Sequence, residues 1–261
     1  MRAALTDEAA IVSVDVSTRE LHLPTVRAQA REFATAAVRD HLGHLAYLAE
    51  LLSVEVEDRE ARRRERRIAE ARFPRLKRLS EFDLSAAPSI EGATVAALAS
   101  GAWIEAGEPV VLLGDSGTGK THLLIGLGIA ACERGRRVRY VTAAALVNEL
   151  VEAEGDREVS KVVGRYARLD LLCLDELGYL HLDRRGAELL FQVLTERDER
   201  ASIAVASNAP FSEWGQTFSD PRLAAAVVDR LTFRAHILET GSASYRLRSS
   251  AGGAKGGGPA S

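Results

Sequence analysis

Eight consecutive residues have the types and spacing that phosphate chemistry requires: Gly114, Asp115, Ser116, Gly117, Thr118, Gly119, Lys120 and Thr121. They match the P-loop spacing G-x-x-x-x-G-K-[ST]. Glycines let the backbone take positive φ and turn its N–H groups toward an anion. We expect Lys120 to reach the β- and γ-phosphates of a nucleoside triphosphate, and the Thr121 hydroxyl to bind Mg²⁺. The cofactor contacts are expected to extend to His122. The alternative interpretation of the whole motif is a plain glycine turn between a strand and a helix, without a ligand.

A pair of carboxylates, Asp175 and Glu176, ends the apolar run Leu171–Leu174. This is the pattern of a Walker B strand, which is buried on both faces like other central parallel strands. Open α/β sheets bind ligands at the carboxyl ends of their strands. We therefore expect Asp175 to hold Mg²⁺, directly or through water, and Glu176 to orient and deprotonate the attacking water. An apolar run followed by Asp-Glu is a weak signal alone and a strong one downstream of a P-loop.

Two further polar residues follow predicted elements. Asn208 comes after the buried run 202–206, where it is a candidate to hold the catalytic water; otherwise it only begins the turn before Pro210. Arg230 falls at the end of a helix that begins near Pro221. Stabilising the charge on a transferring phosphoryl group usually needs a cation beyond Lys120 and Mg²⁺. Arg230 is a candidate to supply it to a neighbouring subunit.

Alternating strands and helices must position these residues. Apolar runs predict strands over 109–113, 138–142, 169–176, 202–206 and 236–239, with helices between them over about 120–131, 143–152, 157–167, 184–200 and 221–231. A repeated strand–helix pattern predicts a parallel sheet. Residues 101–246 are therefore expected to form an α/β nucleotide-binding domain. Trp103 is expected either in its core or beside the nucleotide base.

The chain before this domain is expected to form a small all-helical domain over residues 21–78. Thr25 is expected to cap its first helix, Asp40 a second, and Ser53 a third that stops at Pro74.

Three other segments have less pattern. Residues 79–100 are expected to be a connector with a short helix after Ser89. Residues 1–20 are interpreted as a flexible extension, an over-early start, or a short strand at Ile11–Val16. The tail 247–261, rich in Gly, Ser and Ala, is predicted to be disordered.

Arginines crowd the third predicted helix and continue past it, mixed with several acidic residues. One interpretation is a solvated helix with i,i+4 ion pairs. The other is a surface for the phosphate backbone, since arginine forks suit phosphate geometry. No motif here reads bases, so binding would be independent of sequence. The candidate DNA contacts are Arg62, Arg63, Arg66, Arg67, Arg75 and Lys77.

The composition of the 261 residues is that of an ordinary globular protein, with 46% hydrophobic and 27% charged residues. The formal net charge is −3, so nucleic-acid contacts must come from local patches. Cys132 and Cys173 lie in apolar runs and are expected to be buried thiols, which fits a cytoplasmic protein. No apolar run reaches the roughly 18–20 residues of a membrane span, and no secretion signal is expected.

On these residues the chain resembles the IstB-like helper ATPases of bacterial insertion sequences. These are AAA+ proteins related to the helicase loader DnaC and the initiator DnaA. The resemblance covers about Leu21 to Arg246. Beyond the P-loop, the segments that carry it are Leu45–Leu52, Ala71–Pro74, Phe82–Leu84, Leu174–Tyr179, Ser207–Gly215, Asp229–Leu231 and Ser244–Arg246.

The resemblance implies an ATPase that binds duplex DNA independently of sequence, assembles on it as an oligomer, deforms it and recruits a transposase. It implies that Arg230 is an arginine finger for a neighbouring subunit and that Arg246 acts like a sensor-2 arginine. The chain departs from the family at Ala206, where threonine is frequent, and at Asp115-Ser116, where proline is common. Neither departure removes a catalytic group.

Two other functions are compatible with a P-loop. The first is a helicase-loader adaptor of the DnaC type, which would use ATP as a timer. The second is a small-molecule kinase, which usually needs a mobile lid with arginines. Residues 143–168 hold only Arg157, Arg165 and Arg168, with no obvious lid.

Overall fold

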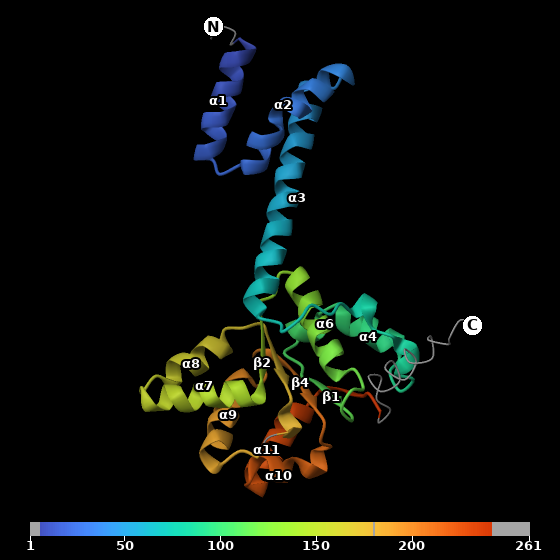
Figure 1. The fold of residues 1–261 in the computed structure, drawn as a ribbon, viewed down its shortest axis with the longest axis vertical. Helices are drawn as coiled ribbons and strands as arrows, with labels where there is room; N and C mark the ends of the chain where they lie inside the picture. Colours follow the sequence, from blue (N-terminus) through green and yellow to red (C-terminus); the bar gives the residue numbers. More distant parts are fainter. Residues whose placement is uncertain (1–5, 180, 242–261) are drawn as a thin grey trace, which may run out of the picture. The chain divides into compact units, whose positions relative to one another are not determined.

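The computed structural model describes residues 6–179 and 181–241. The chain divides into two compact units between Arg66 and Arg67. The division falls within the long helix α3 (His44–Ala71), which is drawn in Figure 1. The two units are therefore described separately.

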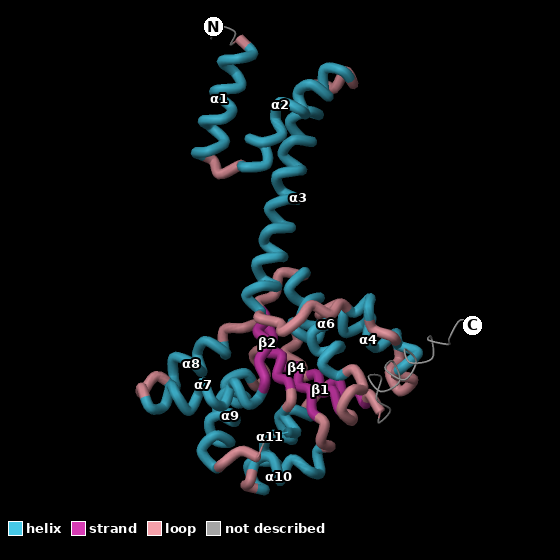
Figure 2. Tube along the Cα trace, in the orientation of Figure 1, coloured by secondary structure: helices cyan, strands magenta, loops and turns pink. Residues whose placement is uncertain are grey.

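A five-stranded parallel sheet forms the centre of the second unit (Figure 2). The strands lie in the order β2-β3-β4-β1-β5, and the pairing places Leu113 of β1 opposite both Ser207 and Glu239. This confirms the predicted α/β class and the five predicted strands. The bounds are β1 (Val110–Leu113), β2 (Val138–Thr142), β3 (Leu171–Asp175), β4 (Ser202–Ser207) and β5 (His236–Glu239).

Helices cover both faces of this sheet, so its strands are buried on both sides. Val110 and Leu112 point into one core and Val111 and Leu113 into the other, as alternation along a strand requires. The first core is shared with α4 (Gly92–Ala99), α5 (Ala102–Glu105) and α6 (Lys120–Glu133). The second is shared with α7 (Ala143–Gly155), α8 (Val159–Ala167), α9 (Arg184–Arg197), α10 (Trp214–Phe218) and α11 (Pro221–Thr232).

Trp103 belongs to the first core, which decides between its two predicted positions. Its side chain is 4% exposed, and its indole N–H donates to the Leu98 carbonyl at 2.8 Å. The predicted thiols are also buried, and burial raises the pKa of Cys132 to about 12. In the described part of the chain, no helix is long and apolar enough to cross a membrane.

Small residues on α6 let the preceding connector pack close to that helix. A Cβ at Gly126 would lie 2.6 Å from a Leu79 methyl, and one at Gly128 would lie 2.8 Å from the Phe73 ring. Glycine inside a helix costs roughly 0.5–1 kcal/mol relative to alanine, so two of them need a packing reason. Here the reason is that Phe73 and Leu79 occupy the space that side chains would fill. The short 3-10 turns Leu79–Glu81 and Leu84–Ala86 follow in the connector.

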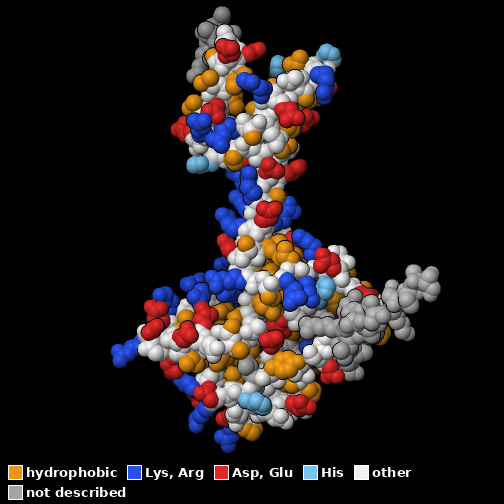
Figure 3. Space-filling view, viewed as in Figure 1, with side chains coloured by type: hydrophobic (Ala, Val, Ile, Leu, Met, Phe, Trp, Pro, Cys, Tyr) orange, Lys and Arg blue, Asp and Glu red, His pale blue; other side chains and the backbone are white. Residues whose placement is uncertain are grey.

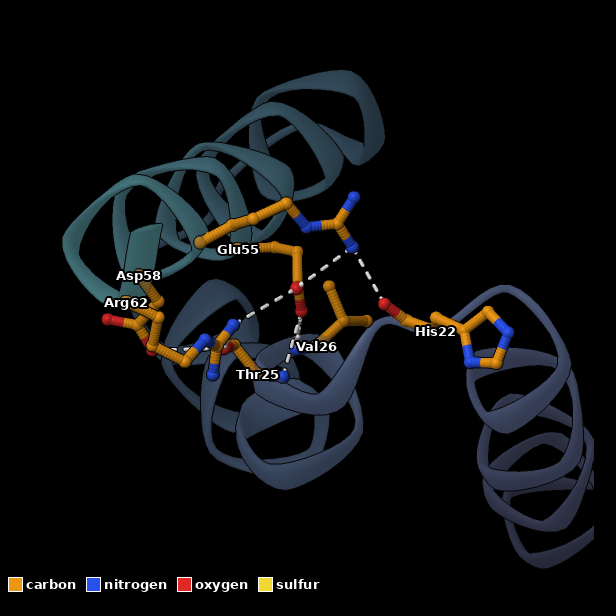
Figure 4. A network of polar contacts seen from close by, with 7 residues as sticks. His22, Thr25, Val26, Glu55, Asp58 and Arg62 are labelled. Atoms are coloured by element: carbon orange, nitrogen blue, oxygen red, sulfur yellow. Dashed lines mark hydrogen bonds and ion pairs between the residues drawn. The ribbon is translucent and has the colours of Figure 1, made fainter. Parts of the chain in front are cut away.

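The first unit contains α1 (Asp7–Glu20), α2 (Pro24–Arg39) and the N-terminal part of α3. Glu55 of α3 is 2% exposed and lies against the start of α2 (Figure 4). Its carboxylate accepts from the backbone N–H groups of Thr25 and Val26 at 2.8 and 3.1 Å. No side chain of α2 itself caps this end. Because free N–H groups at a helix start favour an anionic acceptor, Glu55 caps α2 from another helix.

The predicted helix boundaries in this unit are wrong in three places. Thr25 lies inside α2 and donates its hydroxyl to Asp58, so it is not the cap. Asp40 ends α2 rather than beginning a helix. Ser53 lies within α3, where its hydroxyl donates to the Glu50 carbonyl at 2.8 Å. Serine can return a hydrogen bond to the preceding turn, so its presence does not require a helix to stop.

Residues 7–20 form a helix, so the predicted short strand at Ile11–Val16 is wrong. Thr6 caps this helix by accepting from the Ala9 N–H. Acidic residues occupy its first turn, and Arg19 pairs with Asp15 at 2.9 Å. These end effects favour a helix and outweigh the partial alternation of valines.

Candidate nucleotide site

The P-loop links β1 to α6 in the conformation that an anion cradle needs. Gly114 has φ 146° and Gly119 has φ 100°, so both require glycine. Lys120 begins α6 and is 8% exposed. Its ammonium donates to the carbonyls of Gly114 and Asp115 at 2.6 and 2.7 Å. The lysine is therefore held over the loop at the helix N-terminus, where the dipole favours negative charge.

The end of β5 supports the P-loop from the side, which the sequence pattern does not reveal. The hydroxyl groups of Thr240 and Thr118 share a hydrogen bond of 2.5 Å, in which either group can be the donor. The Thr240 hydroxyl also donates to the Leu113 carbonyl at 3.1 Å. The Asp115 N–H donates to Gly241. A Cβ at Gly114 would lie 2.3 Å from the Thr240 hydroxyl, so the two backbones approach closely. Thr240 thus positions the loop without belonging to it.

Replacing Thr240 by valine is expected to weaken ATP binding about three- to tenfold. The change removes two buried hydroxyl hydrogen bonds, each worth about 0.5–1.5 kcal/mol, while it keeps the shape of the side chain. Titration calorimetry with a slowly hydrolysed ATP analogue measures the effect. The serine variant keeps the hydroxyl and serves as the control, and equal affinity of Thr240→Val and wild type would contradict this role.

The two Walker B carboxylates have different environments. Asp175 is 3% exposed and accepts from the Tyr140 hydroxyl at 2.8 Å and from the Glu176 N–H at 2.9 Å. Burial and the neighbouring Asp175 raise the pKa of Tyr140, so the phenol stays a donor. Glu176 is exposed and has φ 61°, a region that non-glycine residues rarely adopt. Such backbone strain is found at functional positions.

Asn208 lies between these carboxylates and the P-loop, because β4 lies between β3 and β1. Adjacent strands are about 4.8 Å apart, so the carboxyl ends of β3 and β1 are about 10 Å apart. The Asn208 Oδ1 atom is buried and has no hydrogen-bond partner in the described structure. A Cβ at Gly178 would lie 2.5 Å from it, so only glycine fits the Walker B loop against this residue. An orphaned acceptor aimed at this edge suits a bound water or phosphate ligand.

A hollow of about 400 Å³ lies beside the P-loop on the connector side. Phe82 forms one wall, and its ring meets His122 edge-on with 5.4 Å between ring centroids. The His122 Nε2 atom lies 2.9 Å from the Arg78 carbonyl. Apart from the segment Phe82–Leu84 that carries the family resemblance, nothing in the sequence indicates Phe82 as part of this site. Arg75 and Lys77 line this hollow too.

Arg230 lies at the amino-terminal ends of the strands, opposite to the end at which the P-loop lies. It lines a hollow with Pro109 and Ala201, which precede β1 and β4. The length of β1 separates this edge from its own P-loop by roughly 15 Å. The Arg230 guanidinium lies 3.3 Å from the Asp198 carboxylate and 4.5 Å from the Phe191 ring centroid. Arg230 and the nucleotide site of its own chain are therefore not brought together.

The six candidate DNA contacts line three different hollows. Arg62, Arg63 and Arg66 line a hollow in the first unit, Arg67 lines another in the second, and Arg75 and Lys77 lie beside the P-loop. Some of the expected ion pairs exist, since Arg59 and Arg62 lie 3.3 and 3.5 Å from Glu55. Arg246 lies outside the described residues.

The oxygen atoms of Thr121 and Asp175 suit magnesium, which prefers hard oxygen ligands and keeps several waters. Asp175 uses its two oxygens for one hydrogen bond each, which leaves further lone pairs for a ligand. In the described part of the chain no cluster of three or more His, Cys, Asp or Glu residues forms a separate metal cage.

Comparison with known proteins also indicates that the chain binds ATP. The sequence matches the family described as IstB-like ATP binding protein over residues 16–252. An insertion sequence ATP-binding protein of Sinorhizobium fredii is 36% identical over 231 residues, covering 88% of this chain and 78% of the relative. The IS21 ATP-binding protein of Pseudomonas aeruginosa is 37% identical over 212 residues, covering 81% and 80%.

Solved structures resemble the fold of part of this chain. AMPPCP-bound DnaA from Aquifex aeolicus matches with a TM-score of 0.51 at 24% identity, covering 63% of this chain and 50% of DnaA. DnaI matches with a TM-score of 0.51 at 20% identity, covering 62% and 90%. The family match over most of the chain and these relatives show that the chain belongs to the IstB-like ATP-binding family.

Proposed function

We propose that this protein hydrolyses ATP as a DNA-bound helper of transposition. The observation that carries the proposal is the division of the site between two edges of one sheet. Lys120, Asp175, Glu176 and Asn208 follow three adjacent strands, whereas Arg230 lies at the other edge. A site built this way is completed by a second subunit.

Each residue has a separate task in the proposed reaction. The P-loop N–H groups and Lys120 bind the β- and γ-phosphates, and the hollow beside Phe82 takes the base and ribose. Glu176 accepts the proton of the attacking water, and Asn208 orients that water. Magnesium held by Thr121 and Asp175 would neutralise charge on the phosphate oxygens. Arg230 of a neighbouring subunit stabilises the charge that develops on the γ-phosphoryl group.

The family context supports the remaining partners. Relatives are named as ATP-binding proteins of insertion sequences, so we propose a transposase of the same element as the protein partner, in the cytoplasm. The arginine-lined hollow of the first unit supports a contact with the backbone of duplex DNA. A loader of a replicative helicase is the alternative function, since the sequence segments named above also resemble those of proteins related to DnaC.

The test is the ATPase rate over a series of protein concentrations, with and without random-sequence duplex DNA. We expect both DNA and concentration to raise turnover per subunit, because assembly on duplex completes each site. Turnover that ignores both would contradict the helper function. A purified transposase from the same element should bind the ATP-loaded protein, whereas capture of a hexameric helicase instead would favour the loader.

A further inference from the structure

The hydroxyl of Tyr140 ends beside the Walker B carboxylate, although this residue comes from a neighbouring strand. Tyr140 lies on β2 and is 9% exposed. The parallel pairing of β2 with β3 places it opposite Cys173, two residues before Asp175. Side chains alternate along a strand, so Tyr140, Cys173 and Asp175 all point to the face of the sheet that α6 covers. The hydroxyl therefore reaches Asp175 and donates to its Oδ2 atom at 2.8 Å.

Both oxygens of the Asp175 carboxylate are held by donors from the protein. Oδ2 accepts from Tyr140, and Oδ1 accepts from the Glu176 N–H at 2.9 Å. The terminal torsion of an aspartate is broad when nothing restrains it. Two donors on two different oxygens fix this torsion, and each oxygen keeps a further lone pair for a ligand. Tyr140 thus helps to determine how the carboxylate presents its free lone pairs.

Asp175 needs such donors because it is a charged group beneath the surface. The Lys, Arg, Asp and Glu side chains visible in Figure 3 lie on the surface, where water can solvate them. Asp175 is only 3% exposed, and burying a carboxylate is costly unless hydrogen bonds replace its hydration. Loss of the Tyr140 hydroxyl would leave one oxygen of Asp175 without its partner in a place that water reaches poorly.

Packing restricts where the hydroxyl of Tyr140 can lie. The Phe73 ring lies against the Tyr140 ring, with 6.2 Å between centroids and 57° between the ring planes. Phe73 in turn occupies the space beside Gly128 of α6, where a Cβ would lie 2.8 Å from its ring. A donor that is held by packing can orient its acceptor, as the outer partners of metal ligands commonly do.

A simpler interpretation is that a buried phenol takes the nearest acceptor. Tyr166 illustrates this case, since it is 2% exposed and its hydroxyl donates to Glu149 at 2.6 Å. Glu149 is also paired with Arg165, and it lies on α7 away from the P-loop hollow. The two tyrosines make the same kind of bond, and of the two Tyr140 alone makes it to a residue of the nucleotide site. They therefore form a matched pair for an experiment.

We propose that Tyr140 is a positioning residue of the magnesium site, whose hydroxyl fixes the orientation of the Asp175 carboxylate. The inference rests on the proposed function, because it needs Asp175 to be a ligand of the metal that accompanies ATP. Loss of an outer partner of a metal ligand typically weakens metal binding by about 10–100-fold. The effect here should be near the lower end, because Thr121, phosphate oxygens and water would supply the other ligands.

The test is Tyr140→Phe, which removes the hydroxyl and keeps the ring against Phe73. Mn²⁺, used in place of Mg²⁺, is titrated into the full chain in excess over a non-hydrolysable ATP analogue, and electron paramagnetic resonance measures the free ion. We expect the Kd for Mn²⁺ to rise about tenfold in Tyr140→Phe and to stay at the wild-type value in Tyr166→Phe. The affinity for the analogue without metal should be unchanged in both variants.

The ATPase rate gives a second readout that a purely structural role would not produce. The Mg²⁺ concentration for half-maximal turnover should rise about tenfold in Tyr140→Phe, whereas kcat at saturating Mg²⁺ should stay close to wild type. Because Tyr140 acts through Asp175, Tyr140→Phe should add nothing further in the Asp175→Asn background. If Tyr140→Phe does not fold, Tyr140→Met replaces it, since that side chain also fills the space without a hydroxyl.

Asp175→Asn separates the possible failures. If Asp175→Asn binds Mn²⁺ as tightly as wild type, Asp175 is not a metal ligand, and that part of the proposed function falls together with this inference. If Asp175→Asn weakens Mn²⁺ binding and Tyr140→Phe does not, only the inference is overturned. Equal losses of Mn²⁺ binding and of metal-free analogue binding in Tyr140→Phe would also overturn it, because the hydroxyl would then support the fold of the whole site.

Discussion

Replacing Glu176 by glutamine should lower kcat for ATP hydrolysis by about 10²–10⁴-fold, the usual contribution of a general base. The amide keeps the size of the side chain and removes its ability to accept a proton at neutral pH. The P-loop and Asp175 are untouched, so the affinity for ATP should change less than threefold. A phosphate-release assay gives kcat, and calorimetry with a non-hydrolysable analogue gives the affinity.

Glu152→Gln is the matched control for this change. Glu152 is exposed on α7 and does not line the hollow beside the P-loop. Its replacement by glutamine removes the same negative charge. Its kcat should equal that of wild type. If Glu176→Gln hydrolysed ATP at the wild-type rate, Glu176 would not be the base, and its left-handed backbone would need another explanation.

Arg230→Ala should reduce DNA-stimulated hydrolysis by about 10³-fold or more, in the range of other arginine fingers. The same variant should bind ATP normally, because Arg230 lies at the edge of the sheet opposite its own P-loop. The decisive measurement mixes Arg230→Ala with Glu176→Gln, each inactive alone. At a mixed contact, an intact Glu176 meets an intact Arg230 from the other variant, so hydrolysis should return.

The mixture also distinguishes catalysis from folding. Arg230 lies near Asp198 and Phe191 within its own chain, so its loss also removes local packing. A protein damaged in that way would not be rescued by a partner with an intact arginine. Lack of any recovery in the mixture, with both variants folded and assembled, would refute action between subunits.

Much of the second unit follows from the sequence because its signals are local. Each predicted strand is a short run of apolar residues buried on both faces, and each is found where it was expected. The P-loop and the run before Asp175 carry their chemistry within a few residues. Their arrangement then follows from the parallel order of the strands.

The first unit was harder because its deciding contacts join distant residues. Glu55 caps α2 from about 30 positions away, so no cap residue near Pro24 could reveal where that helix begins. Ser53 looked like a helix start but bonds to Glu50 within α3. The capping residue Thr6 and the acidic Asp7 are the residues whose types indicate the start of α1. The alternating valines after them indicate a strand instead, which led to the wrong prediction.

The supporting residues of the nucleotide site were missed for the same reason. Thr240 lies more than a hundred residues from the P-loop that it holds, and Phe82 reaches the loop from the connector. Gly126 and Gly128 carried a usable signal, since glycines inside a helix indicate close packing. They did not say which side chains would fill the space. The assignments of Asn208, Arg230 and the DNA contacts stay predictions.

The placement of Arg230 and the P-loop on opposite edges of one sheet gives any assembly built through them a direction. Such a contact joins unlike surfaces, so successive copies either close into a ring or continue as a helical filament. An open assembly has two chemically different ends. One end subunit has a P-loop that no arginine completes, and the other presents an arginine with no phosphate to meet. Growth, disassembly and capture by another protein can then be confined to one end.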